Sequence, residues 1–556
     1  MTRYSSDSVN CRTRMKKLII SALMLLALGA GLRAQNLDPT VVVTNTYAQQ
    51  AGVVEKPSQL MEMPDSVMRF NLDFDYSALS VPYRGAYEFK PYLVELRPTK
   101  RPTGESLLYL SGGAGYTMHP ELTLIWNPVQ KDYFKLNVYA DHHSYWGNYR
   151  NIVPQGGWFS WDGLRWAGAS SRTIAGVNAL YTWTGGRLEA DIRYRNLFGQ
   201  KEVEDVKQAS AYNAVDFGIR VESDPDASLY YIVRNRSTVM QHPLGKEAHV
   251  KTEAGIGTRF GEHYLRLGVL ADILSTDPAA AGNIAFIPRY IFEHGDFSFD
   301  LGARVSFIFR SDASFYAMPK TPWGYNFPLF PEAHVTYCLI PDSIALYAAV
   351  TGGHVMNTME SLSDTNPFIA SFAGNLDSSI ERVNTCIGIR GNISERFHYD
   401  LKAGYALRGN ALLWGFTDTF APAFGFTEKY HMFYAKLESG WKGDRIDASA
   451  NILFTRTSIN EVRLFAPAMF QGNARLVYNW GGRIRAGITF DGQTERTAAA
   501  ASLPGYVDLG FIGDIDMTRN LGFWIKMGNL LDQTVQRVPF YAEKGIYFTI
   551  GARLIL

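Results

Sequence analysis

The chain has 556 residues, of which 46% are hydrophobic, yet its mean hydropathy is only −0.12, so apolar residues must alternate with polar ones. Beyond the first 34 residues no run of about 20 apolar residues could cross a bilayer as a helix, which excludes a helical membrane protein. The 54 basic and 53 acidic residues give no electrostatic basis for binding nucleic acid, and three cysteines exclude a disulfide scaffold and a Cys-rich zinc site.

Residues 1–34 have the composition of a secretory signal peptide. Arg14, Lys16 and Lys17 precede an apolar stretch from residue 18 to residue 28, and small residues lead to a predicted cleavage site after Ala34. A buried N-terminal helix is the alternative reading, and Met15 is an alternative start. The sequence therefore predicts an exported protein.

Residues 35–104 form a separate N-terminal segment. It contains the extended stretch Thr40, Val41, Val42, Val43 and Thr44, which could add as a strand to a partner protein or be an ordinary part of a leader. The rest of the segment is acidic, aromatic and only partly alternating. We expect it either to occlude a barrel lumen or to lie in the periplasm and bind a partner.

From residue 105 to the end, the dominant pattern has a period of two. Four stretches show it clearly, because one face of each would be apolar and the other polar and charged: 133–141, 187–195, 297–305 and 397–405. This many long strands, each with one apolar and one polar face, need a continuous apolar environment on one side and a large water-filled space on the other. A closed transmembrane β-barrel supplies both.

Turn residues fix the number of strands. Short polar turns, about 33 to 55 residues apart, leave room for two strands and a longer loop between them. Ten such turns join eleven up-and-down pairs, which predicts an all-β, antiparallel barrel of about 22 strands with both ends on the periplasmic side. The turns are Lys131-Asp132, Gly185-Gly186, Asp224-Pro225, Gly261-Glu262, Gly295-Asp296, Pro341-Asp342, Ser394-Glu395, Gly443-Asp444, Gly481-Gly482 and Arg519-Asn520.

Charged residues on the polar strand faces are candidates to line the lumen. They could guide a solute or hold a plug by ion pairs, or they could simply be solvated wall residues. The candidates are Arg187, Glu189, Asp191, Arg193, Arg195, Asp300, Arg304, Asp400 and Lys402.

Aromatic residues concentrate in the longer connections, at 147–170, 311–330 and 410–426. Exposed aromatic clusters are typical of ligand or protein contacts, although rings near strand ends also form the interfacial girdle of barrels. Trp158, Trp161 and Trp166 lie in the middle of a predicted loop and are the candidates for an extracellular contact. No catalytic, cofactor-binding or metal-binding set stands out; an outer-membrane hydrolase is the alternative to a protein that is not an enzyme.

The C-terminus carries the most specific motifs. Phe548, Ile550, Ala552, Leu554 and Leu556 alternate with polar residues up to the last position, which resembles the signal that the outer-membrane barrel assembly machinery recognises. Upstream stand Gly505-Tyr506-Val507-Asp508-Leu509, then Asn529-Leu530-Leu531-Asp532, and finally Gly551-Ala552-Arg553. These motifs resemble the closing strands of TonB-dependent receptors.

The resemblance implies uptake of a nutrient or other solute across the outer membrane of a Gram-negative bacterium. It also implies a TonB box, for which residues 40–44 are the candidate, and a TonB-like energy transducer as partner. No plug-like sequence of roughly 130 residues precedes the predicted barrel. Two alternatives therefore stay open: a plugless structural or assembly subunit that binds other envelope proteins, and a passive diffusion pore. Outer-membrane lipid is the expected surrounding of the barrel in every case.

Overall fold

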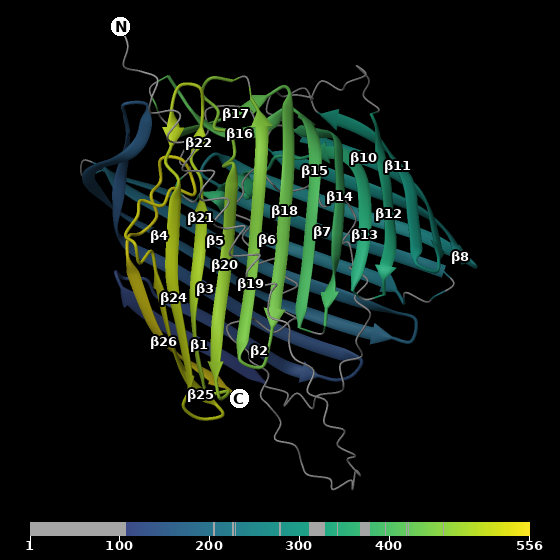
Figure 1. Cartoon of the computed structure of the whole chain (residues 1–556), viewed down its shortest axis with the longest axis horizontal. Coiled ribbons are helices and arrows are strands. Elements are labelled where there is room, and N and C mark those ends of the chain that lie inside the picture. The colour runs from purple at the N-terminus through teal and green to yellow at the C-terminus, as the bar shows by residue number, and fades with distance from the viewer. Residues whose placement is uncertain are drawn as a thin grey trace, which may run out of the picture. The chain divides into compact units, whose positions relative to one another are not determined.

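A computed structural model describes residues 107–556, except 204–205, 225–226, 228, 277–279, 311–327, 342, 367, 369–377, 395, 419, 421 and 460. Within this part the chain forms a closed antiparallel barrel of 22 strands (Figure 1). The predicted fold class is therefore confirmed. No helix in the described part is long and apolar enough to cross a membrane. The predicted signal peptide and the segment 35–104 lie outside the described residues.

The strands follow one another around the barrel in chain order, each paired with its neighbours. The first part of the wall consists of β1 (Leu108–Tyr116), β2 (Glu121–Gln130), β3 (Phe134–Gln155), β4 (Trp158–Trp183), β5 (Gly186–Val203), β6 (Val206–Ser223), β7 (Leu229–His242), β8 (Gly245–Phe260), β9 (His263–Thr276), β10 (Ala280–His294) and β11 (Phe297–Arg310). The second part consists of β12 (Leu329–Ile340), β13 (Ile344–Val355), β14 (Ser379–Ile393), β15 (Phe397–Gly409), β18 (Tyr430–Lys442), β19 (Ile446–Ser458), β20 (Phe470–Trp480), β21 (Ile484–Gln493), β24 (Tyr506–Asp516), β25 (Leu521–Gly528) and β26 (Tyr547–Ile555).

Four short strands and one helix lie in the connections between wall strands. The helix α3 (Met359–Thr365) follows β13, and the hairpin of β16 (Ala411–Phe416) and β17 (Pro422–Thr427) follows β15. A second small hairpin, β22 (Arg496–Thr497) and β23 (Ser502–Leu503), follows β21.

The barrel closes between its first and last strands. β26 pairs with both β25 and β1, and Leu108 and Leu556 exchange two backbone hydrogen bonds of 3.0 and 2.8 Å. All ten predicted short turns connect wall strands at the end of the barrel where the chain begins and ends its sheet, which we call the short-turn end. The connections at the opposite end, the loop end, include the long ones. Four of the ten turns contain a residue with positive φ, at Gly261, Gly295, Ser394 and the Gly481-Gly482 pair, and the polar turn residues predicted the strand count because each of these turns reverses the chain.

Side chains alternate between the two faces of the wall as predicted. In β5, Ile192 and Tyr194 are 56% and 43% exposed on the outer face, whereas Arg195 is 5% exposed on the other. The outer face of the other strands is likewise rich in exposed Leu, Ile, Val and Phe. An apolar outer belt of this kind suits hydrocarbon, while the charged inner face must find partners inside the barrel.

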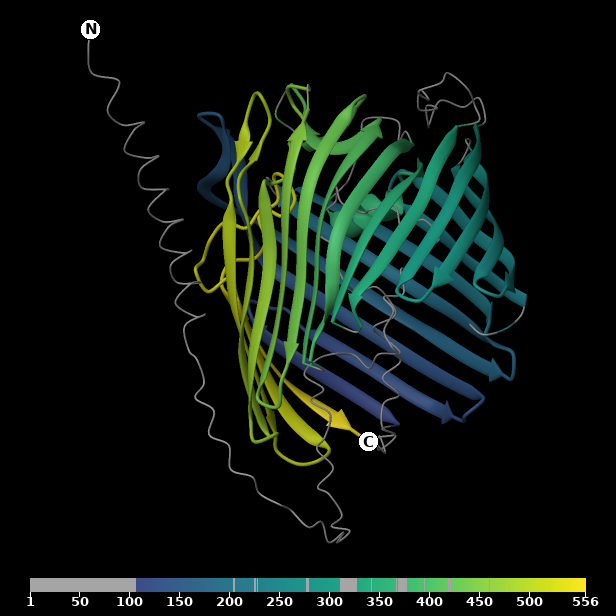
Figure 2. The same cartoon turned by 45° about the vertical axis from the view of Figure 1, so that its right-hand side comes forward.

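Several wall strands are longer than a membrane requires. The wall strands range from 8 residues in β25 to 26 residues in β4, whereas about 9 to 11 residues suffice to cross the membrane. The prediction of a loop at 147–170 is wrong, because β3 and β4 stay paired from Phe134 with Tyr181 up to Gln155 with Trp158. This hairpin projects at the loop end (Figure 2). Its alternating aromatic residues continue the strand pattern beyond the apolar belt.

Candidate functional site

The helix α3 lies inside the barrel. Its segment, residues 356–366, leaves the wall between β13 and β14 but contacts β5, β6 and β7, which stand six to eight strands from β13 around the barrel. Such contacts are made only across the interior. Thr358 caps the helix, because its hydroxyl accepts a hydrogen bond from the backbone N–H of Ser361 at 3.1 Å. We refer to residues 356–366 as the α3 segment.

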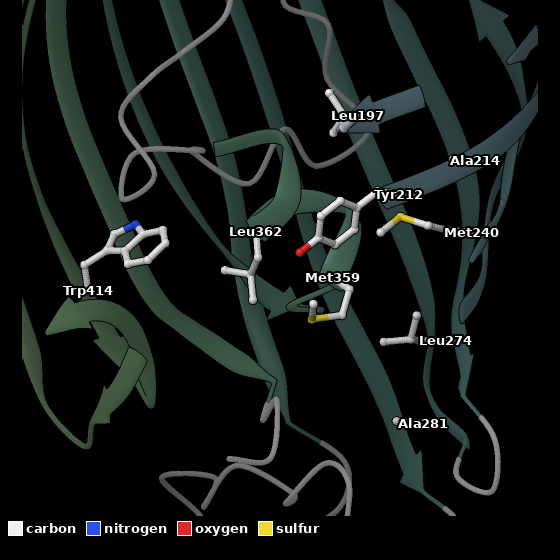
Figure 3. Packing of buried hydrophobic residues seen from close by; sticks show 9 residues of the cluster. All are labelled: Leu197, Tyr212, Ala214, Met240, Leu274, Ala281, Met359, Leu362 and Trp414. Carbon is white, nitrogen blue, oxygen red and sulfur yellow. The ribbon is translucent and has the colours of Figure 1, made fainter. Parts of the chain in front are cut away.

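Apolar residues fix one side of the α3 segment. Met359 and Leu362 are 1% and 5% exposed and pack in one buried cluster with inner-face residues of five wall strands (Figure 3). Trp414 of β16 closes the cluster from the other side. The wall residues of the cluster are Leu197, Tyr212, Ala214, Met240, Leu274 and Ala281.

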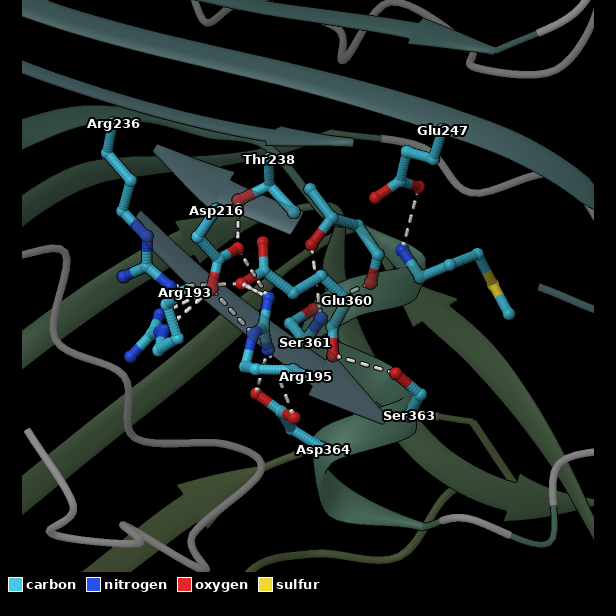
Figure 4. A network of polar contacts seen from close by, with 12 residues as sticks. Arg193, Arg195, Asp216, Arg236, Thr238, Glu247, Glu360, Ser361, Ser363 and Asp364 are labelled. Atoms are coloured by element: carbon cyan, nitrogen blue, oxygen red, sulfur yellow. Dashed lines mark hydrogen bonds and ion pairs between the residues drawn. The ribbon is translucent and has the colours of Figure 1, made fainter. Parts of the chain in front are cut away.

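Charged residues fix the other side of the segment. Arg195 of β5 donates to Glu360 at 2.5 Å and to Asp364 at 3.3 Å, and Arg236 of β7 donates to the same oxygen of Glu360 at 3.0 Å (Figure 4). Arg195 also forms a two-pronged pair with Asp216 of β6, at 2.7 and 2.9 Å. One buried guanidinium therefore holds two carboxylates of the segment and one of the wall.

Asp216 organises the wall side of this network. Besides Arg195, it accepts hydrogen bonds from Arg193 at 2.7 Å and from Thr238 at 2.8 Å, and it is 1% exposed. A buried carboxylate is tolerable only with such a full set of donors. The donors orient Arg195 before the α3 segment arrives, so the segment docks on a prearranged charge.

A backbone contact completes the docking. The N–H of Met359 donates to Glu247 of β8 at 2.9 Å. At the far end of the segment, burial raises the pKa of Asp364, although Arg195 acts to lower it. The segment is therefore held at Met359 by β8 and at Glu360 and Asp364 by β5, with β7 also contacting Glu360.

A second polar cluster lies on β10, β11 and β12. Arg289 pairs with Asp300 at 3.2 Å and with Glu332 at 2.8 Å, and Arg304 pairs with Glu332 at 2.7 Å. Asp300 and Arg304 were predicted from sequence as lumen-facing, and Arg304 is 1% exposed. This cluster braces neighbouring strands.

The other predicted wall residues have separate surroundings. Arg187 pairs with Glu222, and Glu189 accepts from the amide of Asn178 at 3.4 Å. Asp400 accepts from the hydroxyl of Tyr347 at 2.6 Å. The two remaining candidates are half-buried, Asp191 beside Gly218 in β6 and Lys402 opposite Lys436 in β18. Of the nine candidates, Arg193 and Arg195 belong to the network at the α3 segment.

An aromatic cluster joins the connections on the other side of the loop end. Phe159 of β4 is 0% exposed, and its ring centroid lies 4.4 Å from that of Phe540 and 5.3 Å from that of Phe416. Phe465 and Phe420 complete the contacts at 5.9 and 6.0 Å. We call these five rings the Phe159 cluster. It ties together the β3–β4 hairpin, the β15–β18 and β19–β20 connections and the β25–β26 connection.

The three predicted contact tryptophans lie in β4, and their surroundings differ. Trp158 and Trp161 are 42% and 36% exposed, whereas Trp166 is 7% exposed and stacks on Tyr149 with centroids 4.4 Å apart. Phe368, just beyond the α3 segment, packs edge-on against Trp166. Trp166 is thus part of the interior and is not available for an external contact.

The connection from Asn529 to residue 546 is pinned along its length. Asp532 pairs with Arg150 of β3 at 2.7 Å, and Arg537 pairs with Asp491 at 3.0 Å. Burial lowers the pKa of Lys544 against the opposing effect of nearby carboxylates, and its ammonium lies 3.9 Å from the ring centroid of Tyr547. This connection contains the Asn-Leu-Leu-Asp motif.

The two closing-strand motifs meet in space. The backbone N–H of Asn529 donates to Asp508 of the Gly-Tyr-x-Asp-Leu strand at 2.8 Å, and the side chain of Asn529 accepts from Gln533 at 2.9 Å. Asn529 and Asp532 both have positive φ. The motif residues therefore shape the turn by which this connection leaves β25.

Sequence patterns did not identify the acidic residues of α3. Glu360 and Asp364 are four apart on a seven-residue helix inside a loop, and a helix this short leaves no periodic signal. The candidate residues 40–44 lie outside the described part. In the described part, no group of three His, Cys, Asp or Glu is placed to hold a metal ion, and Cys338 and Cys386 are unpaired.

Solved structures with this fold are receptors and transporters. The chain is similar to the ferric-catecholate import receptor Fiu from E. coli K12 (TM-score 0.59, 9% identity, 81% of this chain and 82% of that chain). It is similar to the copper transporter OprC (0.57, 11%, 81% and 80%) and to the ferric enterobactin receptor PfeA from Pseudomonas aeruginosa (0.56, 12%, 81% and 81%). No protein-family model and no curated protein matches the sequence.

These likenesses show the fold. The chain shares its barrel fold with these receptors and transporters, and the closing-strand motifs predicted a barrel of this kind. Identities of 9–12% carry no residue roles from one protein to another. The neighbours are transport proteins, which fits a chain that is not an enzyme.

Proposed function

We propose that the protein takes up a solute across the outer membrane of a Gram-negative bacterium. The observation that carries this proposal is the α3 segment, which crosses the barrel interior and docks on a prearranged charge network. A wide barrel needs something in its lumen, and a loop held by ion pairs can be released. The family of the fold supports uptake as the process that such a release serves.

The orientation follows from the way such barrels are built. The short-turn end, with both ends of the sheet, faces the periplasm, and the loop end faces the medium. The last strand, with Phe548, Ile550, Ala552, Leu554 and Leu556, is proposed to be the signal that the barrel assembly machinery reads. The outer face contacts outer-membrane lipid.

A further part of the proposal is that uptake is coupled to an energy source. Residues 40–44 would pair as a strand with a TonB-like transducer, and residues 35–104 would occlude the short-turn end of the lumen. Thr40 to Thr44 replaced by a Gly-Ser stretch should abolish active uptake and leave the conductance of the purified barrel unchanged. If this variant takes up solute as well as the unchanged protein does, the proposed coupling to energy is wrong and the barrel acts as a passive carrier.

Conductance in planar bilayers tests the function as a whole. We expect the full chain to be closed, deletion of 36–100 to open it partly, and the same deletion combined with Glu360→Gln to open it further, because the α3 segment would then be released as well. A steady open current from the full chain would instead support a diffusion pore. A barrel that stays closed in all variants would contradict transport.

A structural or assembly subunit is the second candidate, and the Phe159 cluster favours it. The cluster makes a firm frame at the loop end, beside which Trp158 and Trp161 remain exposed. Such a frame could seat another envelope protein. Gentle detergent purification from native membranes would decide, since this function requires a stoichiometric partner that Trp158→Ala/Trp161→Ala releases, whereas uptake does not.

A further inference from the structure

Three polar side chains on the inner wall lack hydrogen-bond partners among the described residues. The amide of Asn283 in β10 is 0% exposed and has no partner for either its oxygen or its nitrogen. The same holds for both ring nitrogens of His354 in β13, 1% exposed, and for the hydroxyl of Ser306 in β11, 0% exposed. Buried polar groups are nearly always paired, so three in one region call for a reason.

The sheet register brings these groups together. Asn283 stands opposite Asp272 of β9, and Ser306 stands opposite Ala285, one same-face position along β10 from Asn283. Three strands lie between β9 and β13, yet His354 is close enough to Asp272 for the two side chains to interact electrostatically. A β-bulge between Thr351 and Gly353 changes the register of β13 just before His354, which redirects the end of that strand.

Some of the charged groups of this region already have hydrogen-bond partners. His249 and Asp272 lie 2.6 Å apart, and one oxygen of Glu247 accepts the N–H of Met359 in the α3 segment. The groups that remain without a hydrogen-bond partner are the amide of Asn283, the hydroxyl of Ser306, the imidazole of His354 and the second oxygen of Glu247. Apolar side chains alternate with them on the same wall, among them Leu270 and Leu274 at 1% and 0% exposure.

The α3 segment borders this region and moves with it. Met359 touches Glu247, the apolar cluster of Met359 includes Leu274 and Ala281 next to Asn283, and His354 lies only five residues before Met359. Gly352 and Gly353 precede His354 at the bulge. In the docked form these polar groups are buried without a partner among the described residues, a cost that the ion pairs of the segment offset.

We propose that Asn283, Ser306, His354 and the second oxygen of Glu247 form a binding site for a small uncharged polyhydroxylated solute, a sugar or polyol, which the α3 segment covers when docked. Hydroxyl groups both donate and accept, as the amide, hydroxyl and imidazole require. The interleaved apolar side chains suit the C–H faces of such a solute. The site rests on the proposed function, as the place where uptake holds its cargo.

Equilibrium binding to the full chain in detergent tests the site. The probes are sucrose, raffinose and maltotriose, with citrate and lysine as charged comparisons, measured by titration calorimetry. We expect Glu360→Gln to raise the affinity for at least one of the neutral sugars about fivefold or more, because the site is accessible only when the segment lifts. Adding Asn283→Leu should then lower that affinity at least tenfold.

Asn137 of β3 supplies the matched control. It too is a buried inner-face asparagine without a partner among the described residues, but it lies away from the α3 segment. Asn137→Leu in the Glu360→Gln background should leave sugar binding unchanged. Both leucine variants should keep heat-modifiable migration, since removing an unpartnered buried amide relieves a cost rather than adding one.

The outcomes separate this inference from the proposed function. No neutral sugar bound by the Glu360→Gln variant, tighter binding of citrate or lysine, or equal effects of Asn283→Leu and Asn137→Leu would each overturn the site. Liposome entry of the bound sugar is then measured separately. If the sugar enters liposomes and Asn283→Leu has no effect, the proposed site is wrong and uptake still stands. If the sugar binds but does not enter, the site still stands and uptake is wrong.

Discussion

The loop end holds its connections in two different ways. On the β5–β7 side, the α3 segment is fixed by Arg195 and Arg236 to the carboxylates of Glu360 and Asp364. On the β3–β4 side, the connections are fixed by stacked and edge-on rings around Phe159, at centroid distances of 4.4 to 6.0 Å. One anchorage is charged and the other is apolar.

This difference determines which side can move. When the α3 segment lifts, its carboxylates and the arginines regain water, so much of the lost attraction is returned by hydration. Opening the Phe159 cluster exposes large rings to water with no such return. We infer that the Phe159 side is a frame and the α3 side is a movable cover, which is why a release mechanism belongs with the ion pairs.

Removing the shared guanidinium should have the largest effect. Arg195→Met leaves Asp364 and one side of Asp216 without their cation and leaves Glu360 with Arg236 alone, and removing one partner of a buried pair costs about 3–5 kcal/mol. Hydrogen exchange of residues 356–366 should rise to that of an open loop while the barrel strands keep their protection. Arg187→Met is the control, because Arg187 pairs with Glu222 on the wall. Equal protection of 356–366 in both variants would show that the apolar contacts alone dock the helix.

The Phe159 cluster should respond in the opposite way. Phe159→Ala empties the centre of four ring contacts and should cost about 3 kcal/mol, the usual scale for a buried phenylalanine. We expect protease cleavage in the β15–β18, β19–β20 and β25–β26 connections and no change in exchange of the α3 segment. Trp158→Ala, an exposed neighbour, should leave cleavage unchanged. Loss of both anchorages in Phe159→Ala would mean that they are one unit.

The barrel was predictable because its signals are local. Turn pairs such as Gly481-Gly482 need positive φ, and alternation such as that of β5 follows from two-sided strands, so strand number and face come directly from the chain. The faces of Arg193 and Arg195 followed from the same rule. Both patterns recur around the whole barrel under one constraint, the lipid.

The site was not predictable because its contacts are remote. Arg195 meets Glu360 across 165 residues and across the barrel interior, and nothing in either local sequence marks the pairing. Trp166 looked like an exposed loop residue because strand pairing beyond the membrane, which buries it against Tyr149, has no lipid pattern to reveal it. What lies inside a barrel depends on which connection folds inward.

A smaller test of the frame uses Trp161. The guanidinium of Arg150 lies 4.6 Å from the ring centroid of Trp161 while it also pairs with Asp532. Trp161→Ala should weaken the hold on the β25–β26 connection by about 0.5–1 kcal/mol, the scale of an exposed cation–π contact. Exchange of residues 529–546 should rise slightly, and Trp161→Phe should recover part of the protection. A rise as large as that of Arg150→Ala would contradict the weak role of this ring.

The smallest expected effect is a pH dependence of the α3 side alone. Burial raises the pKa of Asp364 when the segment is docked, and the carboxyl returns to its ordinary value, near 3.8, when the segment lifts. Protonation therefore favours the docked form: this contribution is present below the ordinary pKa and is lost as pH rises through the raised one. Because the side chain keeps 35% of its surface exposed, the change is small. Exchange of residues 356–366 should slow slightly on acidification from neutral pH toward pH 4 after correction for intrinsic exchange, and Asp364→Asn should remove that part of the slope. The Phe159 cluster has no titratable group among its five rings, so its protection should not follow this slope; a parallel change there would place the pH response in the barrel as a whole.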